Sequence, residues 1–153
     1  MSLREQLNAD LKDAMKSGDK RKVATLRLVN SAIKDKDINS RTEGHESALT
    51  GDSGIIDVLA KMVKQRQDSV AAFEQGSRPE LAQAEREEIA VIQSYLPKQM
   101  SDEEARAAVQ AIVSQIGASG IKDMGKVMAE LKTRHAGQMD MAKAGAIVKT
   151  ILN

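Results

Sequence analysis

The sequence predicts an all-α protein, built as an N-terminal bundle of four helices followed by a smaller C-terminal domain of three helices. Apolar residues recur at intervals of three and four along the chain of 153 residues, which is the period of amphipathic helices. Aromatic residues are almost absent, since Phe73 and Tyr95 are the only two. The core must therefore be aliphatic, with eight methionines to fill gaps between helices. A β-protein would be expected to contain more aromatic and β-branched residues.

Two helices are predicted at the N-terminus. Ser2 and Glu5 form the pattern of a capping box, in which each side chain bonds the backbone amide of the other residue. Gly18 suits the end of the first helix, and Asp19 suits the N-cap of the second, which we expect to reach about Ile38. Apolar residues at helical spacing support both helices: Leu3, Leu7, Leu11 and Met15 in the first, and Val23, Leu26, Val29, Ala32 and Ile33 in the second.

A polar stretch at residues 39–54 separates these helices from the next pair, and its composition predicts a mobile loop. The third helix is expected over residues 53–74. A fourth helix follows and runs to about Tyr95, with Ser77 as its N-cap and Glu80 completing a capping box.

The boundary between the two domains is predicted at Pro97, because the residue before a proline is biased away from helix. This divides the chain into residues 1–97 and 98–153. Directly after the boundary, Ser101 and Glu104 form a second capping box, which predicts the start of the fifth helix.

The next stretch contains a short helix surrounded by glycines and cationic side chains. Asp123 is the expected N-cap and Gly137 the expected C-cap, while Asp140 is expected to cap the last helix. Gly125 inside the short helix costs about 1 kcal/mol relative to alanine, so it is expected to let either another helix or the backbone of a partner approach closely. The cations are Lys122, Lys126, Lys132 and Arg134. On charge alone, ordinary solvated helix faces explain them equally well.

Composition excludes several classes of chemistry. The absence of cysteine rules out disulfides, thiolate nucleophiles and zinc–thiolate sites. His45 and His135 do not form part of a recognisable catalytic triad, and the glycines match neither phosphate-binding loop pattern. We therefore expect no catalytic residue, no cofactor and no metal site. The acidic run of Glu85, Glu87 and Glu88 is read as a solvated helix face rather than a carboxylate site.

Hydropathy and charge also bear on location. No apolar run approaches the roughly 20 residues that cross a bilayer, so no membrane association is expected. The N-terminal residues carry charges throughout and show no hydrophobic region of the signal-peptide kind. These features predict a cytoplasmic protein. The net charge of +1 gives no overall attraction to nucleic acid.

Several short motifs occur in an order that resembles one protein family. They are Leu26-Arg27-Leu28, Ala32-Ile33-Lys34, Lys64-Gln65-Arg66, Tyr95-Leu96-Pro97, the run KDMGKVMAEL at residues 122–131 and the closing run VKTIL at residues 148–152. Together they resemble the GatB/YqeY family, which is similar to the tail of the B subunit of the glutamine-dependent tRNA amidotransferase. The resemblance covers nearly the whole chain.

The resemblance implies an all-helical, non-catalytic module that binds tRNA, with a tRNA synthetase or an amidotransferase component as a further partner. The implied contacts to the RNA backbone are Lys122, Gly125, Lys126, Lys132 and Arg134. Two alternatives stay open. One is a protein-interaction module that docks on a partner enzyme. The other is a carbon–nitrogen ligase with glutamine as amido-N donor, which rests on the family label because the sequence offers no catalytic constellation for it.

Overall fold

The computed structural model describes residues 1–42 and 50–153. Within these residues it contains seven α-helices, one short 3₁₀ helix and no strand, which confirms the all-α prediction. The chain divides into two compact units, Met1–Leu96 (unit 1) and Pro97–Asn153 (unit 2). No helix in the described ranges is both long enough and apolar enough to cross a bilayer.

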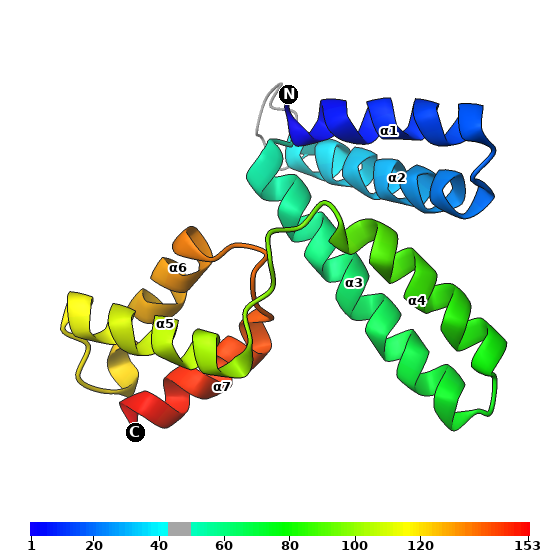
Figure 1. The fold of residues 1–153 in the computed structure, drawn as a ribbon. Coiled ribbons are helices and arrows are strands. Elements are labelled where there is room, and N and C mark those ends of the chain that lie inside the picture. Colours follow the sequence, from blue (N-terminus) through cyan, green and yellow to red (C-terminus); the bar gives the residue numbers. More distant parts are fainter. Residues whose placement is uncertain (43–49) are drawn as a thin grey trace. The chain divides into compact units, whose positions relative to one another are not determined.

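Unit 1 consists of two helical hairpins. Helices α1 (Leu3–Ser17) and α2 (Lys20–Thr42) lie side by side, as do α3 (Asp52–Gln75) and α4 (Pro79–Gln93) (Figure 1). Helix α2 also contacts α3 and α4, so one aliphatic core serves all four helices. Its buried members are Leu7, Leu26, Val29, Ile33, Ile55, Leu59, Met62, Val63 and Ile92.

The predicted boundaries between α1 and α2 are confirmed. The Ser2 hydroxyl accepts a hydrogen bond from the Glu5 amide at 3.2 Å, and the Glu5 carboxylate accepts one from the Ser2 amide, so both bonds of the capping box form. Gly18 ends α1 with a left-handed φ of 75°, which glycine adopts without the steric cost of a Cβ. The Asp19 carboxylate then accepts a hydrogen bond from the amide of Lys22 in the first turn of α2.

The loop expected at residues 39–54 is shorter than predicted. Helix α2 continues to Thr42, and α3 begins at Asp52. Polar residues such as Asn39 and Ser40 disfavour a helix only weakly, and tertiary contacts override that preference. Here the contact is made by Asp37, which Arg4 of α1 binds at 3.1 Å near the end of α2. Residues 43–49, including His45, lie outside the described part of the chain.

The expected N-cap of α4 is also wrong. Ser77 has a φ of 58° and makes no cap, and the N-cap position is Arg78 without a side-chain hydrogen bond. The reason is that Ser77 closes the preceding helix: its amide donates to the Glu74 carbonyl, and the Arg78 amide donates to the Phe73 carbonyl. Pro79 then opens α4 at a position where no amide donor is needed.

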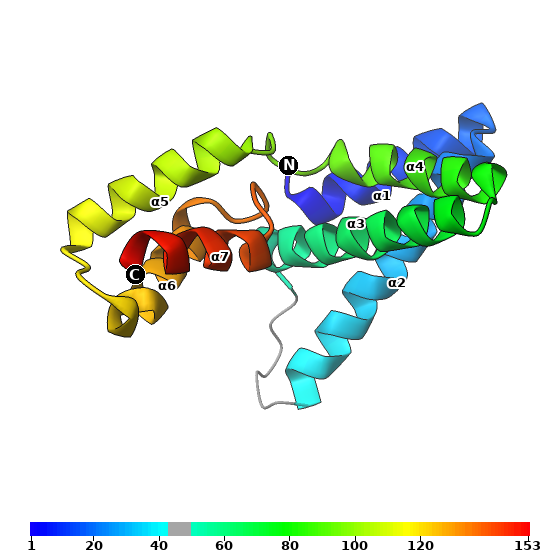
Figure 2. The same ribbon diagram turned by 90° about the horizontal axis from the view of Figure 1, so that it is seen from below.

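Unit 2 consists of α5 (Asp102–Ile116), the 3₁₀ helix η1 (Ile121–Asp123), α6 (Met124–Arg134) and α7 (Met141–Leu152). Each of the three α-helices contacts the other two (Figure 2). Local capping again agrees with prediction, since Ser101 and Glu104 complete their capping box and the Asp140 carboxylate caps α7. The buried core residues are Val109, Ile112, Val127, Leu131, Ala144, Val148 and Leu152.

Candidate nucleic-acid interface

Helix α6 presents one face to the core of unit 2 and the other to solvent. Val127 and Leu131, four residues apart, are fully buried against α5 and α7. Residues three and four apart share one face of a helix, so the buried pair determines which residues point outward. The outward face carries Gly125, Lys126 and Lys132, and all three are exposed.

All three predicted lysines are free to meet a ligand. Lys122, Lys126 and Lys132 are exposed, and none has an ion pair with any residue that the structure describes. Lys122 lies in η1, directly before α6, and the Asp123 carboxylate is close enough to feel the charges of both Lys122 and Lys126. We call Lys122, Gly125, Lys126 and Lys132 the lysine surface.

Gly125 occupies open space at the centre of the lysine surface. A Cβ atom built on it would meet nothing within 4 Å. The sequence left two explanations open for this glycine. The first, close approach by another helix, is not seen among the described residues. Close approach by a partner's backbone stays a prediction.

Asp123 does not cap α6 as expected. It occupies the N-cap position without a side-chain cap bond, and its carboxylate instead accepts a hydrogen bond from the Ser119 amide at 3.0 Å. That hydrogen bond, together with the nearby charges of Lys126 and Lys122, lowers the pKa of Asp123. The carboxylate is consequently ionised at neutral pH and offsets part of the positive charge of the two lysines.

Arg134 differs from the lysines because its guanidinium group already has partners. Its Nε atom lies 3.0 Å from the Glu130 carboxylate, one helical turn away, and a terminal nitrogen donates to the Gln115 side chain of α5. Arg134 is exposed, but it lies seven residues after the buried Val127 and its side chain reaches Gln115 of α5. The structure therefore does not bring Arg134 onto the lysine surface.

The end of α6 also differs from the expectation. The helix ends at Arg134 with His135 as C-cap, whereas Gly137 adopts its left-handed φ of 74° in the following turn. The His135 Nδ1 atom lies 2.8 Å from the Gln138 side-chain oxygen. This histidine is thus part of the turn between α6 and α7.

Sequence reasoning missed the charged groups that join the helices of unit 1. Asp37 is buried and accepts hydrogen bonds from Arg4 at 3.1 and 3.2 Å and from the Thr50 amide at 2.7 Å. The spacing of Asp37 could have indicated that it is buried, because position 37 continues the four-residue repeat of the buried Val29 and Ile33. A carboxylate at such a position indicates a buried ion pair.

The acidic run on α4 is not simply a solvated face. Glu88 is largely buried and accepts a hydrogen bond from the Arg66 Nε atom of α3 at 2.9 Å. Glu87 lies 3.1 Å from the Arg21 Nε atom of α2. These carboxylates therefore link α4 to α2 and α3. No cluster of three or more His, Cys, Asp or Glu side chains suited to a metal ion occurs among the described residues.

Comparisons with known proteins agree with this architecture. A family model described as Yqey-like protein matches residues 4–152. Curated relatives named Altered inheritance of mitochondria protein 41, mitochondrial, include one from Eremothecium gossypii, 30% identical over 95% of this chain and 78% of its own length. The Kluyveromyces lactis relative is 35% identical over 72% of this chain and 58% of its own length. The match to the Candida glabrata relative covers 47% of that protein.

These relatives correct one expectation. The sequence predicted a cytoplasmic location from the character of its N-terminal residues. The relatives from all three organisms are named as mitochondrial proteins, which contradicts that prediction.

Proposed function

This chain belongs to the Yqey-like protein family, and from that premise we propose that it is a non-catalytic accessory protein that binds tRNA through the lysine surface of α6. Membership confirms the resemblance that the motifs carried. We further propose that the ligand is tRNA and that the lysines contact its backbone phosphates. A tRNA synthetase or an amidotransferase component is the partner that would share the tRNA.

The observation that carries the proposal is the state of the three lysines. Lys126 and Lys132 are exposed on α6 with Gly125, Lys122 is exposed in η1 directly before it, and no described carboxylate forms an ion pair with the three lysines. Arg134, by contrast, is paired with Glu130. Ammonium groups without a carboxylate partner can bind phosphate oxygens directly, because no ion pair within the protein has to be broken first.

The composition determines what kind of RNA binding to expect. The two aromatic residues, Phe73 and Tyr95, lie in unit 1 and are partly buried, so stacking on bases is not available at α6. Residues 98–153 contain 8 Lys and Arg against 6 Asp and Glu, a net charge of +2. Recognition would therefore depend on the shape and the phosphates of a folded RNA. Binding should be weak and should decrease steeply with salt.

The protein-docking alternative loses its main support. It required exposed Met and Leu side chains on α6, but Leu131 is fully buried, and Met124 and Met128 are half-buried with their methyl groups near Gly145 of α7. Polar and charged residues dominate the outward face of α6, which favours a polyanion over an apolar partner.

The test is an equilibrium titration of the full chain with total tRNA at about 50 and 200 mM salt. The variant is Lys122→Glu/Lys126→Glu, and the matched control is Lys143→Glu/Lys149→Glu, which makes the same charge change at two exposed positions of α7. We expect salt-sensitive binding by the wild type and the control, and its loss in the variant. No binding by the wild type at the lower salt would refute the proposal, and equal losses in both variants would refute the lysine surface.

A further inference from the structure

Methionine is the only sulfur-containing residue of this chain, which has eight methionines and no cysteine. Peroxides oxidise an accessible thioether to methionine sulfoxide, which is polar where the thioether is apolar. Such a change affects a fold only if two requirements are met. The side chain must be reachable from solvent, and it must contribute to the packing between elements.

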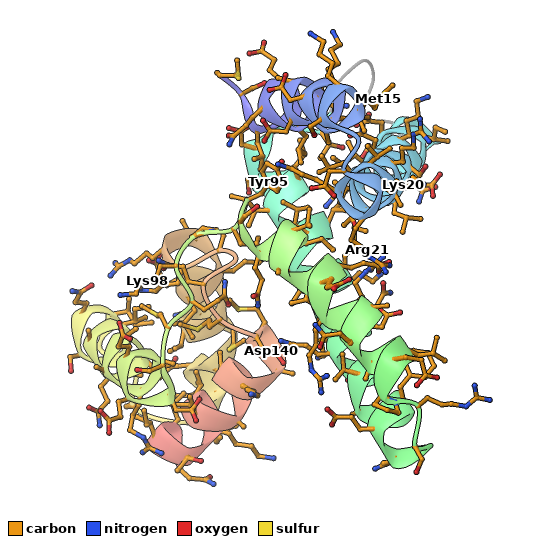
Figure 3. All side chains as sticks on the ribbon, turned by 45° about the vertical axis from the view of Figure 1, so that its right-hand side comes forward. Met15, Lys20, Arg21, Tyr95, Lys98 and Asp140 are labelled. Carbon is orange, nitrogen blue, oxygen red and sulfur yellow. The ribbon has the colours of Figure 1, made fainter. Side chains whose placement is uncertain are left out.

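The methionines of unit 1 meet only one of these requirements. Met15, near the end of α1, is 53% exposed (Figure 3), so a sulfoxide at this position would remain in water. Met1 is 90% exposed. Met62 of α3 belongs to the core, but it is only 7% exposed, so a peroxide would reach it poorly.

Met124 and Met128 of α6 meet both requirements. Each is half-buried and packs against the core of unit 2. They are four residues apart, so they lie on one face of the helix. Their methyl carbons converge on Gly145 of α7, where they lie 3.6 and 3.9 Å from the position that a Cβ atom of residue 145 would occupy. The two thioethers therefore form part of the contact between α6 and α7.

Oxidation would place a sulfoxide oxygen in this contact. That oxygen accepts hydrogen bonds, and a polar group that leaves water without a hydrogen-bond partner is unfavourable. The core against which the pair packs consists of aliphatic side chains, which offer no hydrogen-bond donor. The oxidised side chains would therefore turn towards solvent, and the contact of α6 with Gly145 would be lost.

We infer that Met124 and Met128 form a reversible oxidation site through which a peroxide loosens α6 from α7. In each reaction the sulfur lone pair attacks one peroxide oxygen, the O–O bond breaks and an S–O bond forms. The sulfur loses two electrons, and hydrogen peroxide is reduced to water. Methionine sulfoxide reductases reverse the change. The inference does not rest on the proposed function, although α6 also carries Lys126 and Lys132 of the lysine surface.

The experiment is hydrogen-exchange mass spectrometry of the full chain before and after treatment with hydrogen peroxide. Peptide masses also determine which methionines have gained oxygen. The variant is Met124→Leu/Met128→Leu, because leucine has nearly the volume of methionine and contains no sulfur. The matched control is Met139→Leu/Met141→Leu, which replaces two other half-buried methionines that pack against the same core. Thermal melting of each untreated variant establishes that it is folded.

In the wild type we expect oxidation of Met124 and Met128 to be faster than that of the buried Met62. Amide exchange in α6 and α7 should then increase, and the melting temperature should fall by about 4 to 8 °C. The control should respond as the wild type does. The Met124→Leu/Met128→Leu variant should keep its original exchange although its other methionines are oxidised. A mixture of the two reductases, one for each sulfoxide epimer, should restore the wild type.

Four results would overturn the inference. Met124 and Met128 that stay unreacted after Met15 is fully oxidised would show that the pair is inaccessible. Unchanged exchange after oxidation of the pair would show that the contact tolerates sulfoxides. Equal loosening of the wild type and the Met124→Leu/Met128→Leu variant would attribute the effect to other methionines. No recovery with the reductases would contradict a reversible site. All four results are independent of tRNA, so the proposed function stands or fails separately.

Discussion

Replacement of Asp37 by asparagine should destabilise unit 1, because this carboxylate joins α2 to α1 and to Thr50, just before α3. Asp37 of α2 is only 7% exposed. It accepts two hydrogen bonds from Arg4 of α1, at 3.1 and 3.2 Å, and one from the Thr50 amide, just before α3, at 2.7 Å. Arg4 also donates to the Thr50 carbonyl at 3.0 Å. The substitution Asp37→Asn preserves the shape of the side chain but removes its charge.

The magnitude follows from these contacts. Burial raises the pKa of Asp37, but hydrogen bonds from Thr50 and Arg4 outweigh burial and lower the pKa to about 2. Hydrogen bonds to a charged group contribute about 1.5 to 3 kcal/mol. Because the Arg4 side chain is 29% exposed, solvent screens part of this stabilisation. We therefore expect the free energy of unfolding to fall by about 1 to 2 kcal/mol. For a unit of this size, that is a decrease in Tm of about 5 to 10 °C.

The assay is urea unfolding of the wild type, Asp37→Asn and the exposed control Asp35→Asn between pH 7 and pH 2. The folded-state pKa of Asp37 is lowered, so its contribution is present above the unfolded value of about 4 and disappears as the pH falls towards 2. The difference in the free energy of unfolding between the wild type and Asp37→Asn should therefore decrease as the pH falls from about 4 to 2. An Asp37→Asn variant as stable as the control at pH 7, or a difference that persists unchanged at pH 2, would refute this reasoning.

Three further substitutions test the helices. Gly54→Ala should destabilise unit 1, because the new Cβ would lie 2.5 Å from the Thr50 Cγ2 atom; adding Thr50→Ser should restore the urea midpoint, and no rescue would contradict the clash. Gly125→Ala should raise the stability of unit 2 by about 1 kcal/mol in urea while weakening tRNA binding; unchanged binding would exclude close approach of RNA there. Ser101→Ala should cost about 1 kcal/mol in thermal unfolding, and a smaller loss than in an exposed Ser114→Ala control would contradict the role of the capping box.

The positions of most helix ends could be predicted because they depend on contacts within a few residues. The capping boxes that begin with Ser2 and Ser101 are complete in sequences of four residues. Gly18 and Gly117 end their helices with left-handed backbone that glycine adopts most readily. Such features are readable from the sequence since no distant residue is needed to form them.

Local reading failed where a polar residue had two possible partners. Ser77 is a good N-cap type, but it closes α3 instead. Asp123 is also a good N-cap type, but it binds the Ser119 amide before α6. In both cases the residue lies in the connection between two α-helices, and the geometry of that connection decides which backbone groups it meets.

The all-α class, most of the helix boundaries and the family resemblance could therefore be predicted from local patterns of residues. Which side chains meet across distant parts of the chain depends on tertiary packing. Arg134 is bound by Glu130 and Gln115, whereas Lys122 and Lys126 stay exposed without an ion pair among the described residues. Asp37 meets Arg4 across 33 residues of sequence. An ion pair of this kind depends on how helices distant in sequence pack together, and no local pattern of residues encodes that distance.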